Sequence, residues 1–197
     1  EIVIASSKSG MTSYHEKGKI ITKHLPNADH FAYSRNTLDI VTGRKEGAGK
    51  QATALKIFGS NQKLKKSVKG PLNIVNKIIY SHNSKQFAVV GGKGSGLMIY
   101  NTSTHDLVKQ IKLNHTLYDI AFNSAGDIYA AGKKYVYQWR QGDYKLINKI
   151  RIHQGYASSL AISEKNNLLA IGKGYSLEGN INFDVDLYQL NNFEFIT

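Results

Sequence analysis

One phrase recurs along the sequence: a short apolar run that ends in glycine or another small residue. Four of its five copies end at Gly43, Gly92, Gly132 and Gly172, which lie 49, 40 and 40 residues apart. A period near 40 residues is typical of proteins built from repeated four-stranded sheets. The copies span residues 2–6, 38–43, 87–92, 128–132 and 168–172.

Three further short runs accompany the phrase in a fixed order. The central runs are continuous and rich in β-branched residues, which predicts strands buried on both faces, while the last run mixes apolar residues with lysine, as an outer edge strand does. The runs before the phrase are 30–34, 77–81, 119–123 and 159–163; those after it are 11–14, 54–58, 97–100, 136–139 and 185–188; the lysine-rich last runs are 19–23, 63–68, 107–111, 145–150 and 193–196.

The clearest copy, residues 114–140, resembles a repeat of the WD40 family. His115, Asp119 before an apolar strand, and Trp139 at the end of a later strand match positions of that motif, although Asn114 stands where the family has glycine and Arg140 where it has aspartate. The resemblance implies a β-propeller. It also implies structural, hydrogen-bonding roles for His115, Asp119 and Trp139.

The runs predict an all-β fold of about five visible four-stranded blades, with helix essentially absent. We expect the chain to be a single WD40-like propeller domain or a fragment of one, with blades at about 1–27, 28–71, 72–113, 114–153 and 154–197. The first unit begins at its second strand, so the count is nineteen strands, one short of five complete blades. Because exposed sheet edges are a liability, we expect an incomplete propeller or part of a larger, seven-bladed one.

Composition narrows the classes of function. The 197 residues include no cysteine, which excludes disulfides, thiolate zinc sites and a cysteine nucleophile, and no stretch approaches the roughly 20 apolar residues of a membrane-spanning helix. The seven histidines show no metal-ligand spacing, although His115 and His153 hold equivalent places where a structural hydrogen bond is expected. We expect no enzyme activity, no metal and no cofactor.

Three local features invite chemical interpretations. The segment 43–50 has glycines and a lysine but not phosphate-loop spacing, and 91–96 fits a hairpin turn better than a dinucleotide fingerprint. Glu178, Asp184 and Asp186 form the only acidic cluster, on an expected loop from Gly172 to Phe183. The two aspartates share one face of a strand, which a cation could bridge; solvated loop charges are the plainer interpretation.

Positive charge is the strongest functional signal. The formal charge is +12, with a net +7 between Gly43 and Gly70 and a net +5 between Lys133 and Arg151. Clustered lysines are the footprint of a protein that binds polyanions through phosphate contacts, and lysines also block edge-to-edge aggregation of sheets. The predicted polyanion or partner contacts are Lys63, Lys65, Lys66, Lys69, Lys133 and Lys134.

The sequence therefore favours a non-catalytic scaffold in a multi-subunit assembly. Its partners would be other proteins and an acidic surface or RNA, as in a ribonucleoprotein or ribosome-assembly particle, which implies the nucleus, nucleolus or cytoplasm. Two alternatives remain open at this stage: a trafficking propeller that engages a small GTPase at a membrane, and a secreted or periplasmic binding propeller. The spacing of the last hundred residues is similar to that of a small-subunit processome propeller, and segment 43–50 resembles a loop of a GTPase exchange-factor propeller.

Overall fold

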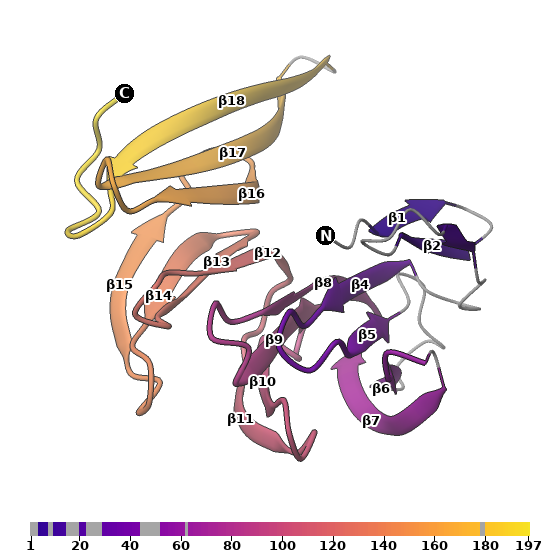
Figure 1. Ribbon diagram of the computed structural model, residues 1–197. Coiled ribbons are helices and arrows are strands. Elements are labelled where there is room, and N and C mark those ends of the chain that lie inside the picture. Colours follow the sequence, from indigo (N-terminus) through magenta and orange to yellow (C-terminus); the bar gives the residue numbers. More distant parts are fainter. Residues whose placement is uncertain are drawn as a thin grey trace.

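The protein is an all-β structure of antiparallel sheets (Figure 1). The computed structural model describes residues 4–7, 10–14, 20–22, 29–43, 52–61, 63–177 and 180–197. Within these ranges every regular element is a strand. This agrees with the alternating and β-branched runs of the sequence and with its lack of any amphipathic helical stripe.

Eighteen strands form five sheets, each from consecutive strands of the chain. Three sheets have four strands, and the first and last described sheets have three. The strands are β1 (Ile4–Ser7), β2 (Gly10–Tyr14) and β3 (Ile20–Thr22); β4 (His30–Tyr33), β5 (Ile40–Gly43), β6 (Ala52–Phe58) and β7 (Leu64–Leu72); β8 (Val75–Tyr80), β9 (Gln86–Gly91), β10 (Leu97–Asn101) and β11 (Leu107–Ile111); β12 (Leu117–Phe122), β13 (Ile128–Gly132), β14 (Tyr135–Trp139) and β15 (Leu146–Arg151); and β16 (Tyr156–Ser163), β17 (Leu168–Leu177) and β18 (Asn180–Gln189).

The sheets lie next to one another in chain order, an arrangement compatible with a propeller (Figure 1). No closed ring is identified among the described strands. Eighteen of the nineteen predicted runs correspond to a strand. The exception is 193–196, which forms no regular strand but still pairs with β18: an isolated bridge joins Phe195 to Tyr188, and backbone hydrogen bonds join Leu187 to Ile196 and Thr197.

The predicted loop from Gly172 to Phe183 is wrong. Strands β17 and β18 pair continuously from Leu168 opposite Gln189 to Leu177 opposite Asn180, so the segment is a long hairpin. The error has a physical reason. Glycine and serine in this part of β17 give no hydrophobic alternation, yet their backbone groups still complete the ladder with β18.

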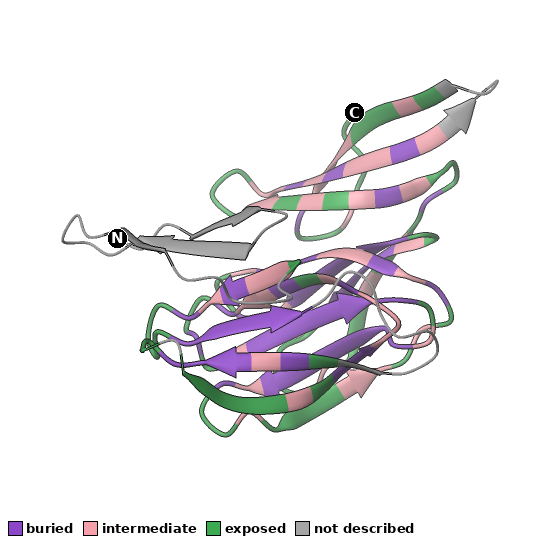
Figure 2. Cartoon of the chain, turned by 90° about the vertical axis from the view of Figure 1, so that its right-hand side faces the viewer, coloured by how far each residue is buried: buried purple, intermediate pink, exposed green. Residues whose placement is uncertain are grey.

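The core lies between successive sheets, because the central strands bury both faces. In β9, Ala88 and Val90 pack toward the β12–β15 sheet, whereas Phe87 and Val89 pack toward the β4–β7 sheet. The same alternation in β13 joins the β12–β15 and β16–β18 sheets. Figure 2 shows these central strands buried and the outermost strands largely exposed.

Six hairpin turns share one hydrogen-bonding motif. A side-chain oxygen accepts a hydrogen bond from the backbone N–H two residues later, and the residue between them adopts a positive φ where it is described. Such Asx and hydroxyl turns allow non-glycine residues in a left-handed conformation. The accepting side chains are Thr37, Asn61, Asn83, Thr104, Asp143 and Asn192.

Segment 91–96 is a turn between β9 and β10, as the sequence predicts. Gly96 has a φ of 65°, and a side chain there would meet the carbonyl oxygen of Ile111 in β11. Glycine is therefore required by close packing of the backbone and not by a ligand.

The division between central and outer strands gives a stability prediction. Ile99 in β10 is fully buried, so Ile99→Ala should lower the free energy of unfolding by about 2–5 kcal/mol. Val108 in β11 is half-exposed, so Val108→Ala should change it by less than about 0.5 kcal/mol. Urea unfolding followed by circular dichroism measures both values, and equal losses would contradict the placement of the core.

Candidate interaction surface on the outer strands

The predicted lysines around β7 divide into two kinds. The Lys65 ammonium lies 2.7 Å from an oxygen of Asp39, and the Lys66 ammonium lies 3.0 Å from an oxygen of Asp106. The hydrogen bond from Lys66 holds the pKa of Asp106 below its ordinary value. Lys63 and Lys69 are exposed and form no ion pair with a described residue. Half of this predicted group is therefore engaged within the protein.

Lys133 and Lys134 lie in a different place. They form the exposed turn between β13 and β14, whereas Lys63 precedes β7 in the turn after β6. Because strands alternate in direction, the turn between the second and third strands lies at the opposite end of a sheet from the turn between the third and fourth. The fold thus separates Lys133 and Lys134 from Lys63, so the predicted contacts do not form one patch.

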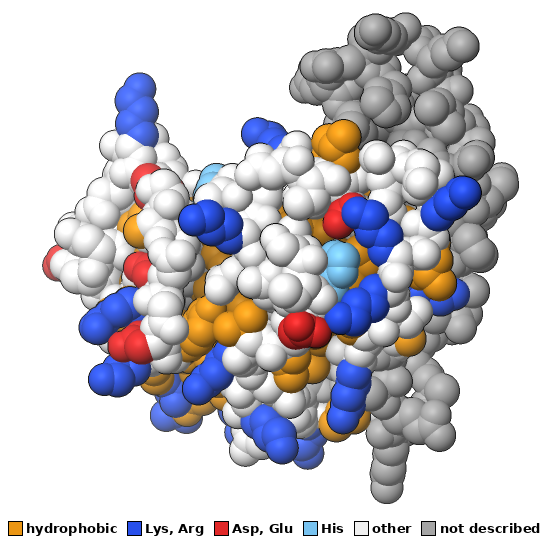
Figure 3. All heavy atoms as spheres, turned by 60° about the horizontal axis from the view of Figure 1, so that its bottom comes forward, with side chains coloured by type: hydrophobic (Ala, Val, Ile, Leu, Met, Phe, Trp, Pro, Cys, Tyr) orange, Lys and Arg blue, Asp and Glu red, His pale blue; other side chains and the backbone are white. Residues whose placement is uncertain are grey.

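The outer strands β7, β11 and β15 carry the clearest charge bias. Together they hold six basic residues and no acidic one. On the face shown in Figure 3, lysine and arginine side chains are scattered around hydrophobic patches, with few acidic side chains. The six basic residues are Lys65, Lys66, Lys69, Lys109, Lys149 and Arg151.

His115 makes a buried polar contact inside the β12–β15 sheet. Its Nδ1 lies 3.2 Å from the Asn114 side-chain oxygen, and its Nε2 lies 3.0 Å from the Tyr137 hydroxyl. Nδ1 therefore donates to Asn114, and Nε2 accepts the hydroxyl proton of Tyr137. Burial, followed by the positive charges of Lys134 and Lys149, lowers the pKa of His115, and burial raises the pKa of Tyr137 to about 12.

Trp139 extends this cluster of rings. It is buried and stacks on Tyr137 with ring centroids 5.0 Å apart. His153, which the sequence places in equivalence with His115, is exposed. The equivalence of the two positions therefore does not extend to burial.

Asp119 ties three successive sheets together. One carboxylate oxygen accepts the backbone N–H of Ile120 at 2.9 Å and lies 3.4 Å from the ammonium of Lys77 in β8; the other accepts the N–H of Leu160 in β16 at 3.0 Å. A carboxylate offers two acceptor oxygens, whereas a side-chain amide offers one. Asp119 thus links β8, β12 and β16.

A second set of inter-sheet contacts was not predicted from the sequence. The positive-φ turn residues His105 and Tyr144 each reach back to the preceding sheet: His105 Nε2 lies 3.5 Å from the buried carboxylate of Asp39, and the Tyr144 hydroxyl accepts from Gln86 at 2.6 Å. Phe193 lies with its ring centroid 6.0 Å from that of Tyr129. The available signal was an aromatic or imidazole ring just before the last run of two successive repeats and at the start of the last run of the next.

The acidic pair of the last sheet is satisfied by a lysine. As the sequence predicts, Asp184 and Asp186 share a face of β18, and the Lys173 ammonium lies 3.5 Å from the first and 2.6 Å from the second. Despite the opposing effect of burial, these carboxylates raise the pKa of Lys173. The cation between them is therefore a protein side chain. Glu178 lies outside the described residues.

Other sequence features have the following outcomes. Residues 44–50 lie outside the described part of the chain. Within the described ranges, no group of three or more histidine, aspartate or glutamate side chains could hold a metal ion. No described helix is long and apolar enough to cross a membrane.

The contacts of Asp119 predict a graded loss of stability. Asp119→Ala leaves the N–H of Leu160 without its acceptor and should cost about 2–3 kcal/mol. Asp119→Asn keeps one acceptor oxygen and should cost less, and Lys77→Ala, at a partly exposed ion pair, should cost less than about 1 kcal/mol. Chemical denaturation of the three variants tests this order, and a loss of equal size in all of them would contradict it.

The environment of His115 predicts a pH dependence. Its pKa is lower in the folded protein than in the unfolded chain, where it is about 6.5. As the pH falls below that value, the unfolded chain takes up the proton first, so stability declines with acid. Stability curves at several pH values should show a shallower decline for His115→Gln than for the wild type. The same substitution at exposed His153 is the control, and an unchanged slope in His115→Gln would contradict the assignment.

Comparisons with known proteins add no further identification. No family model matches the sequence, and no curated protein matches it. What stands is the observed all-β arrangement of antiparallel sheets, its inter-sheet contacts and its basic outer strands.

Proposed function

We propose that this chain is a WD40-like propeller unit that serves as a non-catalytic scaffold in a multi-subunit assembly and presents its basic outer surface to RNA phosphates. The family part of the proposal rests on the repeat of residues 114–140 and on the order of the sheets. The partner part rests on charge. A rigid stack of sheets with positive outer strands is suited to holding an anionic chain in place.

One observation carries the partner: β7, β11 and β15 carry six basic residues and no acidic residue. Lysines on an edge strand also prevent aggregation, and that role needs only a few of them. Two of the six, Lys65 and Lys66, are engaged with acidic side chains, which leaves Lys69, Lys109, Lys149 and Arg151 as exposed positive groups.

The expected mode of binding is contact with phosphates and not with bases. Lysine ammonium groups act as point charges, which suits phosphate oxygens but carries no sequence information. Lys63 precedes β7 and Lys69 lies near its other end, so the two extend one contact zone along this strand, and Lys133 and Lys134 form another on a different sheet. A flexible single strand could follow both zones.

Salt dependence tests the proposal. With four phosphate contacts, the affinity for a single-stranded RNA should fall about fiftyfold when monovalent salt rises from about 50 to about 200 mM. Fluorescence anisotropy with a labelled oligouridylate measures this change. Binding that is equally tight at both salt concentrations would refute the proposed function.

Charge-reversal variants locate the contact. Lys63→Glu with Lys69→Glu should weaken oligouridylate binding about tenfold or more, and Lys133→Glu with Lys134→Glu should do so to a similar or smaller degree. The matched control is Lys85→Glu with Lys165→Glu, which changes the total charge equally at exposed turns elsewhere. An equal loss in the control would show that only net charge matters and would contradict a defined surface.

A further inference from the structure

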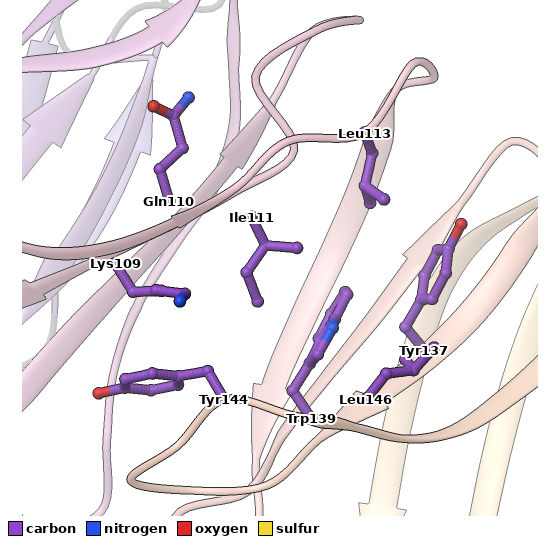
Figure 4. Close-up of a pocket in the computed structure, with 8 residues that line it drawn as sticks. All are labelled: Lys109, Gln110, Ile111, Leu113, Tyr137, Trp139, Tyr144 and Leu146. Carbon is purple, nitrogen blue, oxygen red and sulfur yellow. The ribbon is translucent and has the colours of Figure 1, made fainter.

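A groove opens between the third and fourth described sheets on their outer side. Its volume is about 380 Å³, and it lies between β11 and the strands β14 and β15 with the turn that joins them. Figure 4 shows side chains from both sheets around it, with Ile111 and Leu113 on one side and Trp139 and Tyr144 on the other. Its lining includes Lys109, one of the exposed outer-strand lysines, but none of Lys63, Lys69, Lys133 and Lys134, which form the two RNA contact zones proposed above.

The interior of the groove is apolar. Two of its polar lining groups are engaged: the Gln110 amide donates to the carbonyl oxygen of Ser95, and the Tyr144 hydroxyl accepts from Gln86. Lys109 is its one charged lining residue. Trp139 is covered on one face by the stacked ring of Tyr137. The space therefore suits an aliphatic or aromatic side chain better than a group that needs hydrogen bonds.

Basic side chains outnumber acidic ones around the groove. Lys109 lines it, and residues 106–113 and 143–151 contain five basic side chains and two acidic ones, Asp106 and Asp143, which pair with Lys66 and Arg140. One of the five, Lys149, lies over the Tyr135 ring at 3.7 Å. Charge complementarity therefore calls for an occupant with carboxylates on either side of its apolar anchor. The five are Lys109, Lys112, Lys145, Lys149 and Arg151.

Exposed aliphatic side chains extend the apolar surface beyond the groove. Leu107 and Leu146 begin their outer strands and are 47% and 50% exposed, and the residues after them, Val108 and Ile147, are 46% and 39% exposed. The core does not require apolar residues at these positions, and protection of an edge favours charge there. Their presence beside the groove is consistent with a surface that a partner covers.

We propose that this groove binds an extended acidic protein segment that inserts one large apolar side chain between β11 and the β14–β15 turn. The proposal goes beyond the function proposed above, because it adds a protein partner at a separate site. A nucleobase fits less well, since it would bring polar edges into a groove whose amide and hydroxyl groups are engaged and whose tryptophan face is covered.

Selection from a randomised peptide library displayed on phage, with the full chain as target, tests the proposal. The recovered peptides should carry a Phe, Leu, Ile or Met flanked by Asp and Glu. Trp139 is the only tryptophan of the chain and lines the groove, so a synthetic copy of each peptide should alter the protein's fluorescence on titration. Replacing the apolar residue of the peptide by Ala, or its acids by amides, should abolish the change.

Variants of the protein separate this site from general charge. Lys109→Glu and Leu146→Ser should each weaken peptide binding about tenfold. The controls are Lys165→Glu on the exposed turn between β16 and β17, and Leu64→Ser, which alters the equivalent, 54% exposed leucine at the start of β7. All four keep Lys63 and Lys69, so RNA binding and peptide binding can fail independently.

Three outcomes would overturn the proposal. The selection could recover no peptide or only peptides without the acidic and apolar pattern. The recovered peptides could bind the Lys109→Glu and Leu146→Ser variants as tightly as the wild type. Oligouridylate could change the Trp139 fluorescence and displace the peptides, which would assign the groove to RNA.

Discussion

Burial of both faces of every central strand is the constraint on which this structure depends. A sheet such as β8–β11 cannot satisfy it alone, because Phe87 and Val89 point to one side of β9 and Ala88 and Val90 to the other. Each sheet therefore needs a neighbour on each side, and the sheets follow one another in chain order. On the last described sheet, three apolar side chains of β18 have no neighbouring sheet among the described residues and are largely exposed: Ile181, Phe183 and Val185.

Polar contacts between sheets depend on the same packing. Asp119 can accept the N–H of Leu160 only because β12 and β16 lie side by side, and Asp39 meets His105 only because a turn of the next sheet reaches back to it. Burial raises the pKa of Tyr80, and the negative charge of nearby Asp39 adds to the increase. Hydrophobic burial does not by itself set the orientation of two packed sheets, whereas hydrogen bonds and ion pairs do. They fix which face of one sheet meets which face of the next.

Sequence patterns were sufficient for the strands and insufficient for their contacts. Alternation and glycine spacing located eighteen runs, since a strand buried on both faces leaves a continuous apolar signal. They failed between Gly172 and Phe183, where pairing is carried by backbone groups, and over 193–196, where the backbone hydrogen bonds to β18 include one isolated bridge and form no regular strand. The ion pairs of Lys65 and Lys66 join residues 26 and 40 positions apart, and no local pattern reports such distances.

The outer strands are where the sequence is least constrained by folding and therefore most informative about partners. One edge of each outer strand pairs with the third strand of its sheet, while the other edge pairs with no strand among the described residues. Solubility explains lysines there, as at Lys69 and Lys109. Solubility does not explain leucine at the equivalent exposed positions 64, 107 and 146, because exposing an apolar side chain to water is unfavourable. Lysine and leucine together on one outer face fit a surface that meets partners both acidic and apolar, and the groove beside β11 is where the two properties coincide.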